Sequence, residues 1–283
     1  FPNIPFIATE TTSGLATRGY YASKSDTIKR WPYRWDIPFY DGNIGNTISA
    51  YDQVSTPWGS LHEETWKIIK KNKNLSGMYI WTGFDYLGEP TPYDEMWPSR
   101  SSYFGINDLA GLPKDRFFLY RSRWNTSDET LHILPHWNWE GREGEIIPVF
   151  VYTNYDSAEL FVNGKSMGIQ TKNNETPQNR YRLMWMDVKY EPGTLKVVAF
   201  DNQGNKAAEK EIHESEWEIR SWAHRSLVYL KDLPSGHIIQ EEDIWGKRPG
   251  TGVPSRFRER YVGEVLTRNV AEDTLLNEQD FKA

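Results

Sequence analysis

The sequence predicts a multidomain protein in which an α/β segment precedes all-β domains. Three observations support this prediction. Residues 1–124 alternate between short apolar strands, polar loops and helices, which is a β/α pattern. Residues 130–213 contain short runs of alternating apolar and polar residues, typical of antiparallel strands. The segment after Arg225 contains an internal repeat. We therefore expect units at 1–125 and 126–213, and a linker with a small β-rich domain at 214–283.

Composition narrows the class of protein. The 283 residues are 38% hydrophobic with a mean hydropathy of -0.71, and no apolar run reaches the roughly 20 residues of a membrane span. The net charge of -6 argues against nucleic acid as a main partner. Cysteine is absent, and the six histidines are dispersed without ligand spacing, so we expect no metal and no cofactor. The 13 Trp and 16 Tyr fit either a carbohydrate cleft or β-sandwich cores.

The stretch FIATETTSGLATRGYY, residues 6–21, places a carboxylate where an apolar strand opens into a polar loop. Phe6 to Ala8 form the expected strand, and Glu10 follows it. A carboxylate at a strand end is a common way to present an acid to a substrate. The alternative is that Glu10 caps the loop or pairs with Arg18. Glu10 is thus the candidate catalytic residue.

A second strand end carries further candidates. HEETWKIIKKNKN, residues 62–74, predicts a helix with Trp66, Ile68 and Ile69 along one side. GMYIWTGFDYLGEP follows and predicts a buried strand that ends near Trp81 and opens into a loop. Trp81 fits a sugar platform or a packed ring. Asp85 fits a bond to a sugar hydroxyl, a pair with a basic residue, or a helix cap.

The long loop of residues 27–58 lies between these two strand ends. It contains Trp31, Trp35 and Tyr40, which favour an ordered functional loop. A last helix of the segment is expected over residues 117–124.

Several long motifs resemble glycoside hydrolase family 2, in the bacterial β-galactosidase-like group. They are FIATETTSGLATRG, STPWGSLHEETWKIIKK, GMYIWTGFDYLGEPTPY and WPSRSSYFGINDLAGLPKDRFFLYRSRW, and the resemblance extends from Phe1 to about His213. It implies the C-terminal part of a (β/α)₈ barrel, entered at its seventh strand. It also implies that Glu10 is the nucleophile of a retaining glycosidase and that Trp81 faces the sugar. A missing N-terminal portion would then carry any targeting signal.

The same resemblance implies a second carboxylate, within an Asn-Glu pair at the end of the fourth barrel strand. The chain contains two Asn-Glu pairs, Asn174-Glu175 and Asn277-Glu278, and both follow the barrel segment in other contexts. The resemblance therefore implies that this chain lacks the residue that acts as acid and base. Two strands with their helices also cannot close a barrel, because their edges would stay open.

Residues 130–213 predict an antiparallel sandwich. Asn163-Gly164 is a strong hairpin signal between two apolar runs, and residues 190–193 mark another turn. The family resemblance implies that this is an immunoglobulin-like domain. A contribution of His136, Trp137 or Trp139 to a sugar site is a further hypothesis. The charged stretch EIHESEWEIRSWAH, which follows, predicts a linker.

The C-terminal segment repeats with a constant shift (268 − 231 = 37) that pairs Lys231 with Arg268 and Asp243 with Asp280. Gly236 and Asp273 fall at matching turn positions. We expect two similar halves related by a pseudo-dyad.

RSLVYLKDLPSGHIIQEEDIWGKRPGTGVPSRF and YVGEVLTRNVAEDTLL resemble the antifreeze-like (SAF) domain of bacterial sialic acid synthases. That resemblance implies a β-clip fold, a homodimer in which the domain covers the partner's barrel, and a substrate-binding role for Arg248. The alternative for Arg248 is a salt bridge with Glu259 or Glu264.

Three hypotheses follow. The first is a fragment or fusion of a retaining β-galactoside hydrolase that carries the nucleophile but not the acid/base. The second is a non-catalytic chain that binds carbohydrate or a partner protein. The third is the C-terminal, substrate-covering part of a sialic acid synthase. The glycosidase resemblance implies a periplasmic or secreted protein, and the synthase resemblance implies a cytoplasmic one.

Overall fold

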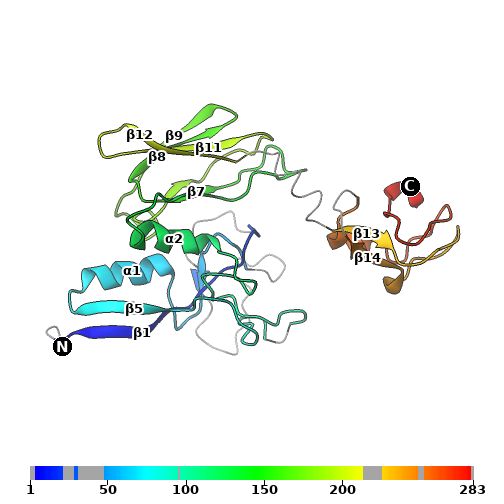
Figure 1. Ribbon diagram of the computed structural model, residues 1–283, viewed down its shortest axis with the longest axis horizontal. Helices are drawn as coiled ribbons and strands as arrows, with labels where there is room; N and C mark the ends of the chain where they lie inside the picture. Colours follow the sequence, from blue (N-terminus) through cyan, green and yellow to red (C-terminus); the bar gives the residue numbers. More distant parts are fainter. Residues whose placement is uncertain are drawn as a thin grey trace. The chain divides into compact units, whose positions relative to one another are not determined.

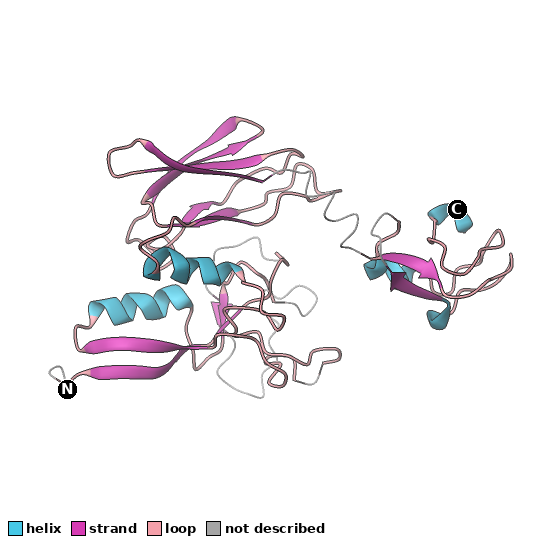
Figure 2. Ribbon diagram, viewed as in Figure 1, coloured by secondary structure: helices cyan, strands magenta, loops and turns pink. Residues whose placement is uncertain are grey.

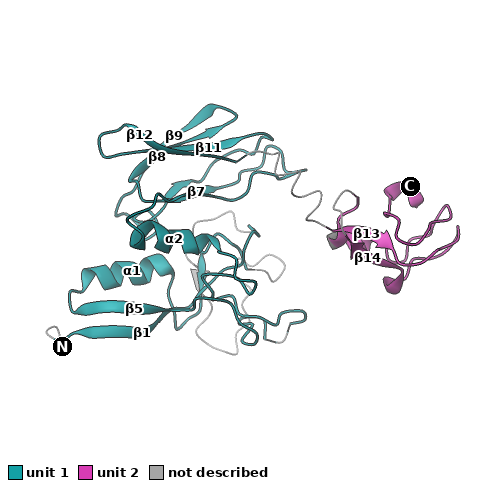
Figure 3. Cartoon of the chain, viewed as in Figure 1, with its two compact units in different colours: residues 1–213 teal, residues 214–283 magenta. Residues whose placement is uncertain are grey.

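The computed structural model describes residues 4–21, 29–30, 48–94, 96–212, 225–247 and 252–281. The chain forms two compact units, residues 1–213 and 214–283 (Figure 3). The expected boundary at residues 213 and 214 coincides with the division between the units, and the one at 125 and 126 falls inside the first unit. No helix within the described ranges is both long enough and apolar enough to cross a membrane.

The first unit begins with a parallel two-stranded ribbon. Strand β1 (Phe6–Thr12) pairs with β5 (Leu75–Trp81), and helix α1 (His62–Lys71) lies in the crossover between them (Figure 1). Parallel neighbours require such a crossover. Acids in the first turn of α1 and lysines in its last turn suit the helix dipole. β1 is longer than expected, so Glu10 lies within the strand and not after it.

The crossover also contains a small sheet in the order β2-β4-β3, made of β2 (Gly14–Leu15), β3 (Lys29–Arg30) and β4 (Val54–Ser55). The expected long loop over residues 27–58 therefore includes two short strands. Trp31, Trp35 and Tyr40 lie outside the described residues, so their expected role stays a prediction.

The buried side of α1 differs from the expectation. Ile68 is 55% exposed, whereas His62 and Glu63 are fully buried. The apolar stripe predicted for this helix is therefore wrong in part, because polar partners elsewhere in the chain cover its first turn. Tyr120 in helix α2 (Asp115–Trp124) lies 2.6 Å from His62 Nδ1 through its hydroxyl.

An antiparallel sandwich follows (Figure 2). One sheet has the order β10-β7-β6, and the other has the order β12-β11-β8-β9. The strands are β6 (Leu131–Leu134), β7 (Val149–Thr153), β8 (Ser157–Val162), β9 (Lys165–Thr171), β10 (Leu183–Trp185), β11 (Leu195–Phe200) and β12 (Lys206–Ile212). All their pairings are antiparallel, which confirms the prediction of an antiparallel sandwich.

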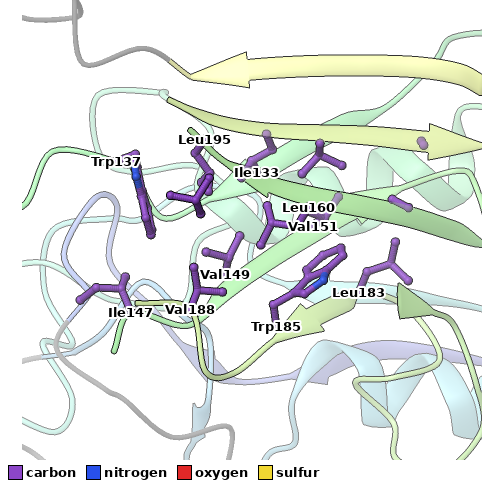
Figure 4. Packing of buried hydrophobic residues seen from close by; sticks show 14 of the residues in the cluster. Ile133, Trp137, Ile147, Val149, Val151, Leu160, Leu183, Trp185, Val188 and Leu195 are labelled. Carbon is purple, nitrogen blue, oxygen red and sulfur yellow. The ribbon is translucent and has the colours of Figure 1, made fainter. Parts of the chain in front are cut away.

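The core of the sandwich lies between its two sheets. Val149 and Val151 of β7 face Leu160 of β8 and Leu195 of β11 within one hydrophobic cluster (Figure 4). In β8 and β11 buried and half-buried residues alternate, as a strand with one core face requires. Trp137 is 1% exposed and belongs to this core. Its indole N–H donates to Glu191 O at 3.1 Å, so the expectation that Trp137 contributes to a sugar site is wrong.

The predicted hairpin at Asn163-Gly164 is confirmed. These two residues alone separate β8 from β9, and both have positive φ, 50° and 78°. Two successive left-handed residues give the turn twist that antiparallel strands favour.

The ribbon and the sandwich share a buried interface within the first unit. Tyr51, Phe150 and Tyr152 belong to a second hydrophobic cluster. Tyr51 donates through its hydroxyl to Pro148 O at 2.7 Å, and Tyr152 donates to Glu63 Oε1 at 3.3 Å. Arg182 Nη1 donates to Tyr51 O at 3.1 Å. Buried polar contacts therefore fix the sandwich against the α/β segment.

The second unit is small and rich in turns. Strand β13 (Ser226–Tyr229) pairs antiparallel with β14 (Ile244–Lys247), and the remaining elements are the 3₁₀ helices η2 (Glu241–Asp243), η3 (Ser255–Arg260) and η4 (Glu278–Asp280). The unit has a hydrophobic cluster of its own.

The predicted repeat of the second unit is confirmed. Gly236 N donates to Leu266 O at 2.7 Å, and the equivalent Asp273 N donates to Tyr229 O at 2.8 Å. Gly236 and Asp273 have φ of 85° and 58°, so both turns use the left-handed region. The helices η2 and η4 also occupy matching positions, so neither copy is helical where the other is extended.

Candidate functional site

Glu10 lies near the carboxyl end of β1, beside the strand that ends at Trp81. The register pairs Thr12 with Trp81, and Thr12 Oγ1 donates to Trp81 O at 3.1 Å. Because the strands are parallel, both residues are delivered toward the same end of the ribbon. Glu10 thus lies two residues before the partner of Trp81 in β1, and the proximity of the two side chains stays a prediction.

Glu10 also lies in an irregularity of β1. Ala8 pairs with Met78 and Thr11 pairs with Ile80, so β1 advances one residue more than β5 between these pairs. Such a bulge bends a strand and redirects the side chains within it. The sequence contains no signal that predicted this bulge.

The side chain of Glu10 is exposed, and within the described part of the chain it makes no hydrogen bond or ion pair. Arg18, the partner considered as an alternative, instead lies 2.6 Å from Asp108 Oδ2 through its Nε. Asp108 also accepts backbone N–H groups from Ala110 and Leu112 at 3.0 and 2.8 Å. The Glu10 carboxylate is thus not held by the partner that a structural role would require.

Trp81 is a packed ring, one of the two roles expected of it, and its role as a sugar platform stays a prediction. Its ring is half-buried and packs on the cluster that contains Leu15 and Phe104. The Tyr86 ring meets it edge-to-face with centroids 5.9 Å apart, and the Tyr86 hydroxyl donates to Glu89 Oε2. Burial and the bond to Glu89 raise the pKa of Tyr86 to about 12, so the phenol stays protonated. Packing therefore fixes the orientation of the indole and leaves part of it accessible.

Asp85 makes the pair with a basic residue that was considered as an alternative. Its Oδ2 lies 2.6 Å from Lys114 Nζ, and its Oδ1 accepts from Gly105 N at 2.7 Å and from Ser102 Oγ at 3.3 Å. Both side chains are nearly inaccessible, at 1% for Lys114 and 8% for Asp85. A bond from Asp85 to a sugar would compete with these three partners.

The remaining candidates are dispersed. Arg248 lies outside the described residues, so its substrate-binding role stays a prediction. His136 and Trp139 stack on each other with centroids 4.2 Å apart, and the guanidinium of Arg142 lies 4.7 Å from the Trp139 ring. Within the described ranges no group of three His, Asp or Glu side chains is arranged to hold a metal ion.

A cavity of about 660 Å³ lies elsewhere in the first unit. It is lined by residues of β5 and α2 and of the loops that follow them, among them Ile80, Phe117, Tyr120 and Trp124. Neither Glu10 nor Trp81 lines it. The candidate site at the strand ends therefore lies outside this cavity.

Comparisons with known proteins define the class of each unit. Residues 224–282 match the model of the SAF domain, so the chain carries a SAF domain at its C-terminal end. Residues 144–208, within the sandwich, match a domain of unknown function (DUF4982). The first three quarters of the chain are similar to glycoside hydrolase family 2 enzymes, which confirms the resemblance seen in the sequence motifs.

Two relatives match most of this chain. Beta-galactosidase BoGH2A from Bacteroides ovatus is 50% identical over 238 residues, which cover 82% of this chain and 26% of that protein. A putative beta-glucuronidase from Formosa agariphila is 34% identical over 216 residues, covering 70% of this chain and 20% of that protein. The chain thus spans between a fifth and about a quarter of the length of these relatives.

Two further similarities concern the fold and the C-terminal unit. The first similarity is to the solved structure of a beta-glycosidase from Bacteroides vulgatus, with a TM-score of 0.59 and 28% sequence identity. The matched region covers 88% of this chain and 32% of the beta-glycosidase chain. An N,N'-diacetyllegionaminic acid synthase from Campylobacter jejuni is 33% identical over 69 residues, covering 24% of this chain and 21% of that protein. This second match falls on the SAF region and agrees with the resemblance to sialic acid synthases.

Sequence reasoning missed two buried cations beside the candidate site, Lys114 and Arg116. Neither cation has a local signal, because each binds groups that lie far away in the sequence.

Proposed function

We propose that the first unit supplies the nucleophile and a sugar platform of a retaining β-galactoside hydrolase. The observation that supports this proposal is the placement of Glu10 and Trp81 at the same end of two parallel strands. An exposed carboxylate in a bulge, next to a half-buried indole, offers an anionic nucleophile and an apolar surface to one sugar ring. The similarity to beta-galactosidase BoGH2A supports the choice of a β-galactoside.

In this proposal Glu10 attacks the anomeric carbon of the sugar. The bond between that carbon and the glycosidic oxygen breaks, and the leaving group departs with this oxygen. A retaining mechanism then needs a second carboxylate about 5 Å from the first, which donates a proton to that oxygen and later accepts one from water. Trp81 orients the sugar by contact with its C–H face. The domains accompanying this site would be the C-terminal part of a (β/α)₈ barrel and an immunoglobulin-like sandwich.

The acid/base is proposed to come from outside these 283 residues. Asp85 is occupied by Lys114, and Glu89 accepts from Tyr86. Glu175 lies in a loop of the sandwich, and Asn277-Glu278 forms the start of η4 in the second unit. None of these carboxylates lies in β1 or β5, the two strands of the parallel ribbon. The greater length of the relatives supports a donor on a portion that this sequence does not include.

Covalent trapping tests the proposal. A 2-fluoro galactosyl fluoride forms a stable ester with a retaining nucleophile, and we expect peptide mass spectrometry to locate that ester on Glu10. Glu10→Gln should remove the label, whereas the matched variant Glu89→Gln should retain it. A label on Glu89, or no label on the wild-type chain, would overturn the proposal.

The sugar class can be tested in the same assay. The corresponding 2-fluoro glucuronyl fluoride is the relevant comparison, because other relatives are named beta-glucuronidases. Faster labelling by the glucuronyl reagent would keep Glu10 as the nucleophile and replace the β-galactoside by a β-glucuronide.

A further inference from the structure

Two cations at the beginning of α2 are buried beside the candidate site. Lys114 immediately precedes the helix and Arg116 lies in its first turn; they are 1% and 0% exposed. Cations are disfavoured here, because the positive end of the helix dipole lies at the helix N-terminus. Burying a charge also costs free energy unless it is paired and hydrogen-bonded. Both residues must therefore be compensated by the groups around them.

Lys114 joins the chain segments that leave the two strands. Its Nζ donates to Ala16 O at 2.7 Å, shortly after the strand that carries Glu10. The same Nζ lies 2.6 Å from Asp85 Oδ2 and 3.3 Å from Tyr103 O, both in the segment that follows Trp81. One ammonium group therefore holds both strand exits.

Arg116 also donates to both of these segments. Its Nη1 donates to Gly14 O at 2.7 Å, in the exit from β1, and to Phe104 O at 3.2 Å, in the segment after β5. Its Nη2 lies 2.5 Å from Asp52 Oδ1, and Asp52 is itself 1% exposed. Two independent cations thus connect the same two segments.

We propose that Lys114 and Arg116 are positioning residues that hold the backbone after Glu10 against the backbone after Trp81. Asp85 then acts as the counter-ion of Lys114 and not as a sugar ligand. This inference rests on the proposed function of Glu10. Its physical reason is that covalent attack tolerates little misplacement: an error of about 1 Å can cost on the order of 10²-fold in rate.

The charge of Lys114 offers a readout that packing alone would not affect. Burial and the neighbouring Arg116 lower the pKa of Lys114 to about 8, although Asp85 and Asp52 favour the ammonium. His62 of α1 also faces this cluster, and burial lowers its pKa well below the ordinary value, so it stays neutral. Raising the pH through about 8 therefore neutralises Lys114.

The test compares Lys114→Met and Lys114→Arg with the matched control Lys172→Met. Lys172 is also largely buried and donates to two carbonyls, Thr153 O and Tyr155 O, both at 2.6 Å, but these belong to the sandwich. We expect Lys114→Met to lower the rate constant for covalent labelling of Glu10 by about 10- to 100-fold at saturating reagent. Lys172→Met should leave this rate constant within about twofold, and Lys114→Arg should restore most of it.

The pH dependence provides the second arm. The labelling rate constant of the wild-type chain should fall as the pH rises from 7 to 9, whereas that of Lys114→Arg should stay level. Equal rate constants for Lys114→Met and Lys172→Met would overturn the inference. Parallel pH profiles of the wild type and Lys114→Arg would do the same, and this second arm holds even if Lys114→Met does not fold.

Hydrogen exchange separates failure of this inference from failure of the proposed function. Amides of residues 10–16 and 82–88 should exchange faster in Lys114→Met at neutral pH than in Lys172→Met, by several-fold, because Lys114→Met removes the ammonium contacts that join these two segments. This result would stand even if Glu10 were never labelled. Unchanged exchange in both segments would refute the positioning role.

Discussion

Leu233 and Val270 exchange two backbone hydrogen bonds, with N–O distances of 3.0 and 2.9 Å. The two residues are equivalent under the repeat, so this pair marks the centre of the pseudo-dyad of the SAF unit. The bridge of Val228 with Leu275 and that of Ile238 with Val265 are related to each other by the same operation. The repeat in the sequence therefore has a direct counterpart in the hydrogen-bonding pattern.

The pseudo-dyad predicts that two buried aspartates have equivalent structural roles. Asp243 lies 2.6 Å from Lys231 Nζ through its Oδ1, and Asp280 accepts from Arg268 Nε at 2.6 Å. Each also accepts a hydrogen bond from the backbone N–H of the residue that caps its 3₁₀ helix, Gln240 and Asn277 respectively. Asp243→Asn and Asp280→Asn should each lower the free energy of unfolding by about 1–3 kcal/mol. Urea unfolding of the variants measures this, with the exposed Glu272→Gln as control. An effect confined to one aspartate would contradict the equivalence.

Asp243 should also make the stability of the SAF unit depend on acidity. Burial raises the pKa of this carboxyl, but Lys231, the Gln240 N–H and His237 outweigh burial and lower it to about 2. The folded pKa is below the ordinary value of 3.8, so the carboxylate stabilises the fold above about pH 4. That contribution is lost as the pH falls through 2. The stability difference between wild type and Asp243→Asn should therefore shrink as the pH falls from 5 to 2. A constant difference would contradict this assignment.

For Lys172 we expect a pH dependence of the same sign, in a higher pH range. Burial and the nearby Arg123 lower the pKa of this ammonium to about 7, from an ordinary value of 10.5. Between these values the unfolded chain holds the proton and the folded chain does not. The unfolding free energy should then rise with pH by about 1.4 kcal/mol per unit from this group alone. Unfolding of the wild type minus that of Lys172→Met, measured from pH 7 to 9, isolates the effect. Parallel stability curves would show that Lys172 keeps its charge.

Local patterns in the sequence predicted those parts of the fold that depend on local physics. Asn163-Gly164 specifies a two-residue turn through its backbone preferences, and alternation specifies strands with one buried face. Strand β12 has the sequence KAAEKEI, which is largely polar and contributes only Ala208 and Ile212 to the core. An edge strand with so few apolar residues carries little periodic signal.

The sequence likewise predicts only part of the candidate site. Glu10 and Trp81 could be proposed from the sequence because each belongs to a recognisable strand within a recognisable motif. The bulge at Glu10 depends on the register between two strands, and a sequence shows register only indirectly. The contacts of Lys114 and Arg116 join groups separated by as many as 98 and 102 residues. The roles of such cations follow from the tertiary fold, so a single sequence does not reveal them.

Turnover by the isolated chain should depend strongly on the leaving group of the substrate. Without a proton donor the leaving oxygen must depart as an anion, and general acid assistance is typically worth about 10²–10⁴-fold. A dinitrophenyl β-galactoside, whose leaving group needs little assistance, should therefore be cleaved detectably, while lactose should be cleaved slower by at least that factor. Glu10→Gln should abolish both activities.

The opposite outcome is equally informative. Efficient cleavage of lactose that is lost in Glu10→Gln would place the acid within these 283 residues, among Asp85, Glu89, Asp94 and Glu95. Asp85 and Glu89 already bind Lys114 and the Tyr86 hydroxyl, and Asp94 lies 3.5 Å from Thr91 Oγ1. The corresponding amide variants would then be compared on lactose and on the dinitrophenyl substrate. The true acid would be the residue whose loss affects lactose strongly and the activated substrate little, because only the poor leaving group needs its proton.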